Sequence, residues 1–278
     1  MLRRLVNTVD LLNSIILASS GFTVGFVGGM SGLVLGVVRF PTVMNIETSV
    51  STVAGTNLSI STLGAITAGI RHYQQGNVQF RAFVIFAVTG ALGAFIGSFL
   101  IAYTPVTLLV TAIGVIVLYE SFTLLRNSRI NINKNKLAKD AASCTNVSNG
   151  RVSVITKWRM ILIESIIGFG IGLLGGLVGL VLGSIRIPAM ISVLRMEPRV
   201  AVGTNLAAAS VMGISGLIGH LINNNIDYNV LIIMGSSTMV GGYLGPRYTN
   251  RFSEKKLKQI IGIVLIAVAI AMFLRAFW

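Results

Sequence analysis

Residues 21–41 read GFTVGFVGGMSGLVLGVVRFP, and residues 168–188 write the same stretch again as GFGIGLLGGLVGLVLGSIRIP. Twelve of the 21 positions are identical, which is far more than chance gives in so apolar a composition. The chain is therefore an internal duplication, and we expect its two halves to share one architecture.

Half of the positions that match are glycines, and several of these lie three or four residues apart. In a helix this spacing places them on one face. In lipid such a face lets another backbone approach closely, so close packing of two helices is one interpretation. The repeated glycines at this spacing include four pairs: Gly25, Gly28, Gly32 and Gly36 recur as Gly172, Gly175, Gly179 and Gly183.

An arginine and a proline follow the glycines in both copies, Arg39 and Pro41 in the first and Arg186 and Pro188 in the second. We expect the proline to break the helix and to free backbone groups. At membrane depth such groups are tolerated only inside protein or beside a watery cavity. The pattern therefore predicts a broken helix next to a polar site.

The composition is that of an integral membrane protein. Hydrophobic residues make up 54%, charged residues 11%, and the mean hydropathy is +0.83. The apolar tracts are about 20 residues long, which is the length that crosses a hydrocarbon core of about 30 Å as a helix. We expect helical tracts at roughly 11–31, 51–70, 82–103, 106–125, 159–183, 200–222, 228–246 and 257–277.

The net charge of +14 does not indicate a nucleic-acid partner, because the Lys and Arg residues lie in loops and at helix ends. Retention of positive charge on the cytoplasmic side explains them. Cys144 is the single cysteine, so there is no disulfide framework. No phosphate-binding loop, metal-spaced Cys/His cluster or nucleophile elbow is present, and we expect neither an enzyme, a cofactor nor a metal site.

We divide the chain into a first membrane repeat (1–125), a basic cytoplasmic linker (126–158) and a second membrane repeat (159–278). Outside Arg39 and Arg186, 20 Lys and Arg residues remain, and four crossings per half would place 13 inside and 7 outside. If each Gly-rich pair enters and returns, the division becomes 17 to 3. The positive-inside rule then favours inverted repeats, each with a broken Gly-rich helix pair and three further transmembrane helices.

A second duplicated motif follows each proline, at a spacing of 148 residues. Gly55-Thr56-Asn57 recurs as Gly203-Thr204-Asn205, and His72 recurs as His220. We expect each motif to begin a helix, where Thr and Asn satisfy free N–H groups. The alternative is functional: two positive helix ends that face an anion.

Together the Gly-rich tract ending in Pro, the GTN segment, the His before a short polar loop and the final segment after RFSEKKLKQ resemble the sulfite exporter TauE/SafE family over nearly the whole chain. One departure is that GGMSG and GGLVG interrupt the run of three glycines that such families often show. The resemblance implies a secondary transporter that moves small anions, such as sulfite, sulfonates or related sulfur oxyanions, usually outward. It implies a multi-pass protein of a prokaryotic plasma membrane.

An oxyanion site needs positive charge and hydrogen-bond donors, and an arginine within a membrane tract is by default a functional hypothesis. Arg39 and Arg186 could supply both, or each could snorkel to an interface. His72 and His220 are candidates for proton coupling, or they merely cap an interface. The predicted substrate site comprises Gly28, Gly29, Gly32, Arg39, Pro41, Thr56 and Asn57 with their counterparts Gly175, Gly176, Gly179, Arg186, Pro188, Thr204 and Asn205.

We expect alternating access around a midplane site between the repeats. A passive anion channel lined by the same broken helices is the alternative. The expected partners are a small anion and the lipid bilayer, with a homo-oligomer left open.

Overall fold

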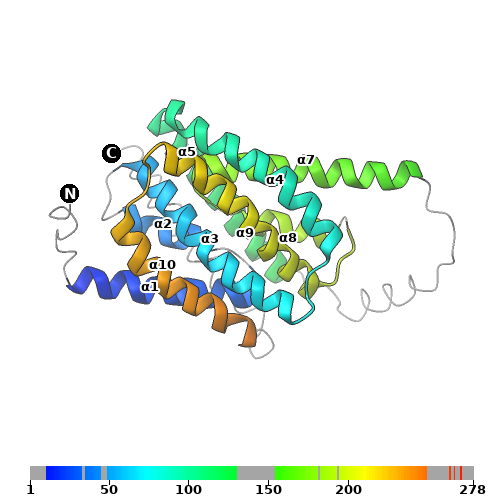
Figure 1. The fold of residues 1–278 in the computed structure, drawn as a ribbon, viewed down its shortest axis with the longest axis horizontal. Helices are drawn as coiled ribbons and strands as arrows, with labels where there is room; N and C mark the ends of the chain where they lie inside the picture. The colour runs from blue at the N-terminus through cyan, green and yellow to red at the C-terminus, as the bar shows by residue number, and fades with distance from the viewer. Residues whose placement is uncertain are drawn as a thin grey trace.

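A computed structural model describes residues 11–32, 35–44, 49–129, 154–180, 182–192 and 194–248, together with 263, 266 and 270. Regular structure in these residues is entirely helical (Figure 1). The long helices are α1 (Leu11–Ser31), α3 (Val50–Gln74), α4 (Phe80–Leu100), α5 (Val106–Arg129), α7 (Val154–Val178), α9 (Pro198–Ile222) and α10 (Tyr228–Leu244). The short ones are α2 (Gly36–Met44), α8 (Gly183–Ser192) and the 3-10 turns η2 (Ile101–Tyr103) and η3 (Gly245–Tyr248).

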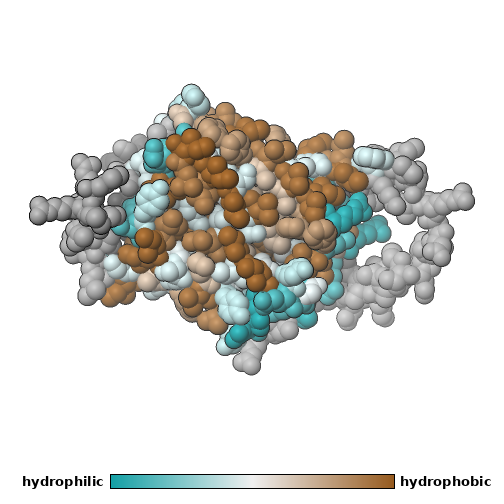
Figure 2. All heavy atoms as spheres, viewed as in Figure 1, coloured by the Kyte–Doolittle hydropathy of each residue, from teal (hydrophilic) through white to brown (hydrophobic). Residues whose placement is uncertain are grey.

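Five of these helices are long and apolar enough to cross a membrane, namely those at Asn13–Ser31, Val50–Gln74, Phe80–Tyr103, Ile161–Val178 and Pro198–Ile222. On the face drawn in Figure 2, hydrophobic atoms cover the middle and hydrophilic atoms gather towards the edges. The prediction of an all-α integral membrane protein is confirmed. Most of the linker and of the predicted tract at 257–277 lies outside the described residues.

Both Gly-rich helices are broken, but at a different residue from the one predicted. Helix α1 ends at Ser31 and is followed by Gly32, whose φ is 74°. Its counterpart Gly179, after α7, has a φ of 72°. Glycine adopts this left-handed conformation without the steric penalty of a Cβ, and it commonly ends helices in this way.

The prolines do not make the break, so that part of the prediction was wrong. Pro41 lies inside α2 and Pro188 inside α8, several residues beyond each break. The glycine with positive φ ends the first helix, and the arginine and the proline belong to the short helix that follows.

Each Gly-rich helix packs against a helix of the other half. Gly21 of α1 lies against Met234 of α10, and Gly29 lies against Gly242, so α1 and α10 run in the same direction. Because these glycines of α1 have no side chain, the α10 backbone can approach α1 closely.

The same arrangement recurs in the second half, where α7 packs against α4. Gly172 lies against the backbone of Gly90, and Gly97 lies against Leu177, so these two helices are also parallel. Figure 1 shows α7 beside α4 and α1 beside α10.

The two central helices, α3 and α9, run in opposite directions. Leu58 of α3 lies against Gly216 of α9, whereas Gly69 lies against Ala207. Since α3 and α9 carry the same duplicated motif, their opposite directions are relevant to the orientation of one half of the chain relative to the other.

Helix α3 is parallel to α10, because Leu63 faces Gly235 while Thr67 faces Gly242. Since α1 is also parallel to α10, α1 and α3 point the same way. The chain therefore has to turn back between them, and it does so through the break after α1 and the short helix α2. This turn carries Arg39 into the interior.

Candidate functional site

The two duplicated arginines are buried inside the helical assembly. Arg39 is 1% exposed and Arg186 is 0% exposed, and they are the two largest fully buried side chains in the described residues. Neither reaches the surface as a snorkelling arginine would. They lie in α2 and α8, which the breaks at Gly32 and Gly179 allow to fold back into the protein.

Arg39 is held by two hydroxyl groups. Its Nη1 donates to Oγ1 of Thr238 at 3.1 Å, and its Nη2 donates to Oγ of Ser61 at 2.7 Å. Within the part of the chain that the structure describes, its Nε has no hydrogen-bond partner. Gly28 and Gly29 line the same cavity as this guanidinium.

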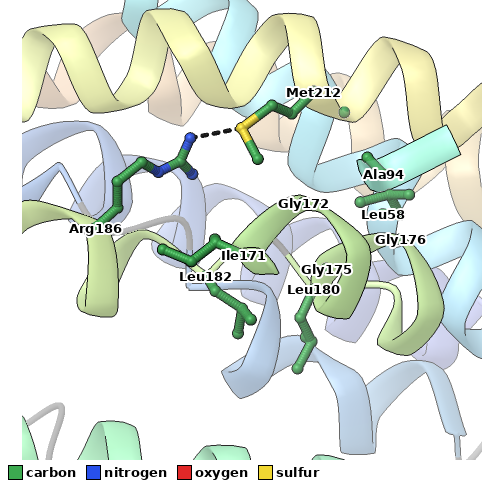
Figure 3. A pocket seen from close by; sticks show the side chains of 11 residues that line it. Leu58, Ala94, Ile171, Gly172, Gly175, Gly176, Leu180, Leu182, Arg186 and Met212 are labelled. Carbon is green, nitrogen blue, oxygen red and sulfur yellow. Dashed lines mark hydrogen bonds between the residues drawn. The ribbon is translucent and has the colours of Figure 1, made fainter. Parts of the chain in front are cut away.

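Arg186 has a different neighbour. Its Nη1 points at Sδ of Met212 at 2.7 Å (Figure 3). Its Nε and Nη2 are buried without a partner among the described residues. Gly175 and Gly176 line this cavity, and much of the remaining wall is apolar.

The two cavities are therefore equivalent places in the duplicated fold. Each combines an arginine with glycines of the preceding broken helix. No carboxylate of the described residues forms an ion pair with either guanidinium, and desolvating an unpaired charge costs several kcal/mol. Each cavity holds one guanidinium that keeps at least one N–H group without a partner among the described residues, and an anion site needs such a positive donor.

Asn57 and Asn205 hold the broken helices rather than line a cavity. Nδ2 of Asn57 donates to the carbonyl oxygen of Gly179 at 3.0 Å, and Nδ2 of Asn205 donates to that of Gly32 at 2.9 Å. Each asparagine thus satisfies the break in the opposite half. The reciprocal contacts tie the two halves together at the point where each chain turns back.

Thr56 and Thr204 contact loops of the opposite half. Oγ1 of Thr56 accepts from the backbone N–H of Asp227 at 2.8 Å, and Oγ1 of Thr204 accepts from that of Gln79 at 2.9 Å.

The prediction that the GTN motifs begin helices was wrong, because α3 begins at Val50 and α9 at Pro198. Both motifs lie in the second turn of their helices. Their backbone N–H groups are therefore not the free donors of a helix end.

His72 and His220 lie behind the glycine walls of the two cavities. Nε2 of His72 is 3.3 Å from the carbonyl oxygen of Gly29, and Nε2 of His220 is 3.1 Å from that of Gly176. The exposed fractions are 2% and 0%, and the Nδ1 atom of each ring is buried without a partner. Each histidine thus contacts the wall of an arginine cavity without entering it.

Sequence reasoning missed Ser61, Thr238 and Met212, which contact the two guanidinium groups. Ser61 and Met212 lie in the helix that follows each arginine, whereas Thr238 lies 199 residues from Arg39. The repeat counterparts of all three residues are different amino acids. Comparing the two repeats therefore could not identify these residues as part of the site. The described residues contain no group of three or more His, Cys, Asp and Glu side chains arranged to hold a metal ion.

Comparison of the chain with protein-family models identifies one matching family. The model described as sulfite exporter TauE/SafE matches residues 17–272. The chain is 28% identical to a probable membrane transporter protein, YdhB, of Bacillus subtilis, over 87% of this chain and 91% of the relative. It is 26% identical to a probable membrane transporter protein of Xylella fastidiosa, over 92% of each chain. No solved structure gives a significant match.

Proposed function

The chain belongs to the sulfite exporter TauE/SafE family, and on this premise we propose that it is a secondary transporter of small anions such as sulfite, sulfonates or other sulfur oxyanions. The observation that carries the proposal is the pair of buried arginines, each in a glycine-lined cavity without a carboxylate beside it in the described residues. An anion bound there would offset the cost of burying the guanidinium. Outward movement is the direction we propose.

We propose alternating access between inverted repeats. The opposed directions of α3 and α9, which carry the same motif, support inversion. The reciprocal bonds of Asn57 and Asn205 to the opposite breaks support a two-fold relation between the halves. In transporters built this way, the halves exchange conformations around a site near the bilayer midplane. The arginine cavities beside the broken helices are the places where that site would lie.

Proton coupling is part of the proposal. A ring nitrogen that contacts a carbonyl oxygen carries its hydrogen, so the neutral His72 and His220 rings would keep a lone pair on Nδ1. Protonation there would place charge behind the wall of each arginine cavity. Anion flux would then follow an imposed pH gradient, and flux that ignores the gradient would remove this part of the proposal.

The chain is a multi-pass membrane protein, and we place it in a prokaryotic plasma membrane because the curated relatives are bacterial. We propose a transporter rather than an enzyme, because its relatives are named as probable membrane transporter proteins.

The test is flux of sulfite in proteoliposomes containing the purified protein. We expect saturable flux that Arg39→Ala and Arg186→Ala each abolish while the protein still inserts. Arg199→Ala, at an exposed position of α9, is the matched control and should transport as the wild type does.

Unchanged flux in both cavity variants would dispose of the arginine assignment. Unitary currents in place of saturable flux would instead favour a passive anion channel.

A further inference from the structure

The two arginine cavities occupy equivalent places but contain different side chains. The spacing of 148 residues pairs Gly90 with Thr238 and Gly64 with Met212. In the first cavity Thr238 supplies a hydroxyl and Gly64 leaves space. In the second, Gly90 leaves space and the Met212 side chain packs into it, its Sδ lying 2.7 Å from where a Cβ of residue 90 would be.

These differences between the paired positions determine how many hydrogen bonds each guanidinium makes. Arg39 donates to two hydroxyl oxygens, from Ser61 and Thr238. The counterpart of Ser61 is Ala209, which offers no acceptor. Arg186 therefore keeps only a thioether contact, and thioether sulfur is a weak acceptor. Its Nε and Nη2 are left without partners.

We propose that the Arg186 cavity binds the anion, and that the Met212 thioether occupies the anion's position beside Arg186 until the anion displaces it. This inference rests on the proposed function and assigns its substrate site to one of the two cavities. Arg39 is then the locked counterpart, whose Nη1 and Nη2 already donate to protein hydroxyls. The anion replaces a weak acceptor with a strong, charge-assisted one, which favours the exchange.

The size of the cavity requires such a displacement. Its volume is about 10 Å³, close to the room that one water molecule needs, about 10 to 15 Å³. A three-oxygen anion does not fit unless the wall moves. The glycine wall of α7 is held against the backbone of α4, at Gly90 and Ala94. Met212 is unbranched with three rotatable bonds, so it is the lining side chain that moves most readily.

The wall also limits the class of anion. Leu58, Ile171 and Leu180 line the cavity together with Arg186 (Figure 3). These side chains offer no donors, so they do not stabilise a second negative charge. The site fits a small anion that presents a single anionic face to Nε and Nη2 of Arg186.

The experiment is equilibrium binding of radiolabelled sulfite and of methanesulfonate to the purified full chain in detergent. We expect one anion per wild-type chain, an affinity at least about 50-fold lower in Arg186→Gln, and a loss of less than about 10-fold in Arg39→Gln. Met212→Ala removes the competing thioether and should tighten binding about 10-fold, or about 1.4 kcal/mol. Met212→Leu keeps most of the packing and should tighten it about threefold.

Met196→Leu, the same change at a buried methionine outside the cavity, is the matched control and should bind as the wild type does. A triple variant, Gly90→Thr with Ala209→Ser and Met212→Gly, copies the locked environment of Arg39 around Arg186 and should lose binding.

Binding that survives Arg186→Gln but not Arg39→Gln, or two anions per chain, would overturn this inference and leave the proposed function standing. Unchanged or weaker binding in both Met212 variants would overturn it in the same way. If wild-type protein binds neither anion, this inference and the proposed function fail together.

Discussion

Two glycines of α7, two residues apart, give a controlled test of the packing between α7 and α4. A Cβ added at Gly172 would meet the backbone of Gly90, with the carbonyl carbon at 2.8 Å and Cα at 2.9 Å. A Cβ added at Gly170 would meet nothing within 4 Å. The same glycine-to-alanine substitution in the same helix is therefore expected to have opposite effects on stability at the two positions.

The magnitudes follow from two general effects. Alanine favours a helix over glycine by about 0.8 to 1 kcal/mol, and this gain applies to both variants. At Gly172 the collision is with backbone, which cannot rotate away as a flexible side chain can. Overpacking of this kind costs about 1 to 3 kcal/mol or more. We expect Gly170→Ala to be stabilising by up to about 1 kcal/mol and Gly172→Ala to be destabilising by up to about 2 kcal/mol.

The assay is thermal unfolding of the purified variants in one detergent, followed by sulfite flux in proteoliposomes. Gly172 also lines the Arg186 cavity, so its alanine variant should lose flux even at temperatures where it remains folded. An unfolding temperature for Gly172→Ala equal to or above that of Gly170→Ala would refute the close approach of α7 and α4.

Three further predictions concern the breaks and the orientation of the chain. Asn205→Ala leaves the buried carbonyl oxygen of Gly32 without its partner and should lower the free energy of unfolding by about 1 to 3 kcal/mol; an unchanged melting temperature would contradict this. Gly179→Ala and Gly76→Ala both place alanine at a φ near +72°, but only at Gly179 does the new Cβ meet another segment, at Ala54. Gly179→Ala should therefore lower the melting temperature more, and equal losses would mean that backbone strain alone acts. Inverted repeats with an odd number of crossings per half place both chain termini outside; a tag-accessibility assay that finds the C-terminus in the cytoplasm would reject that topology.

The fold could be predicted from the sequence where the signal is local or duplicated. The apolar tract at 11–31 coincides with α1, and the repeated glycines marked the helices that pack most closely. The position of the break within each tract could not be predicted, because several glycines precede each proline and any of them tolerates positive φ. Contacts with the opposite half select Gly32 and Gly179, whose carbonyl oxygens accept from Asn205 and Asn57.

The sequence by itself determined that this is a duplicated membrane protein with one arginine in each copy of the Gly-rich stretch, because repetition and hydropathy are properties of the linear chain. Only the tertiary structure decided that the two arginines differ. Thr238 lies 199 residues from Arg39, whereas Met212 lies in the helix that follows Arg186, and at both positions the repeat carries glycine instead. Which acceptor faces each buried charge depends on which helices pack together, and helix packing is a property of the folded chain.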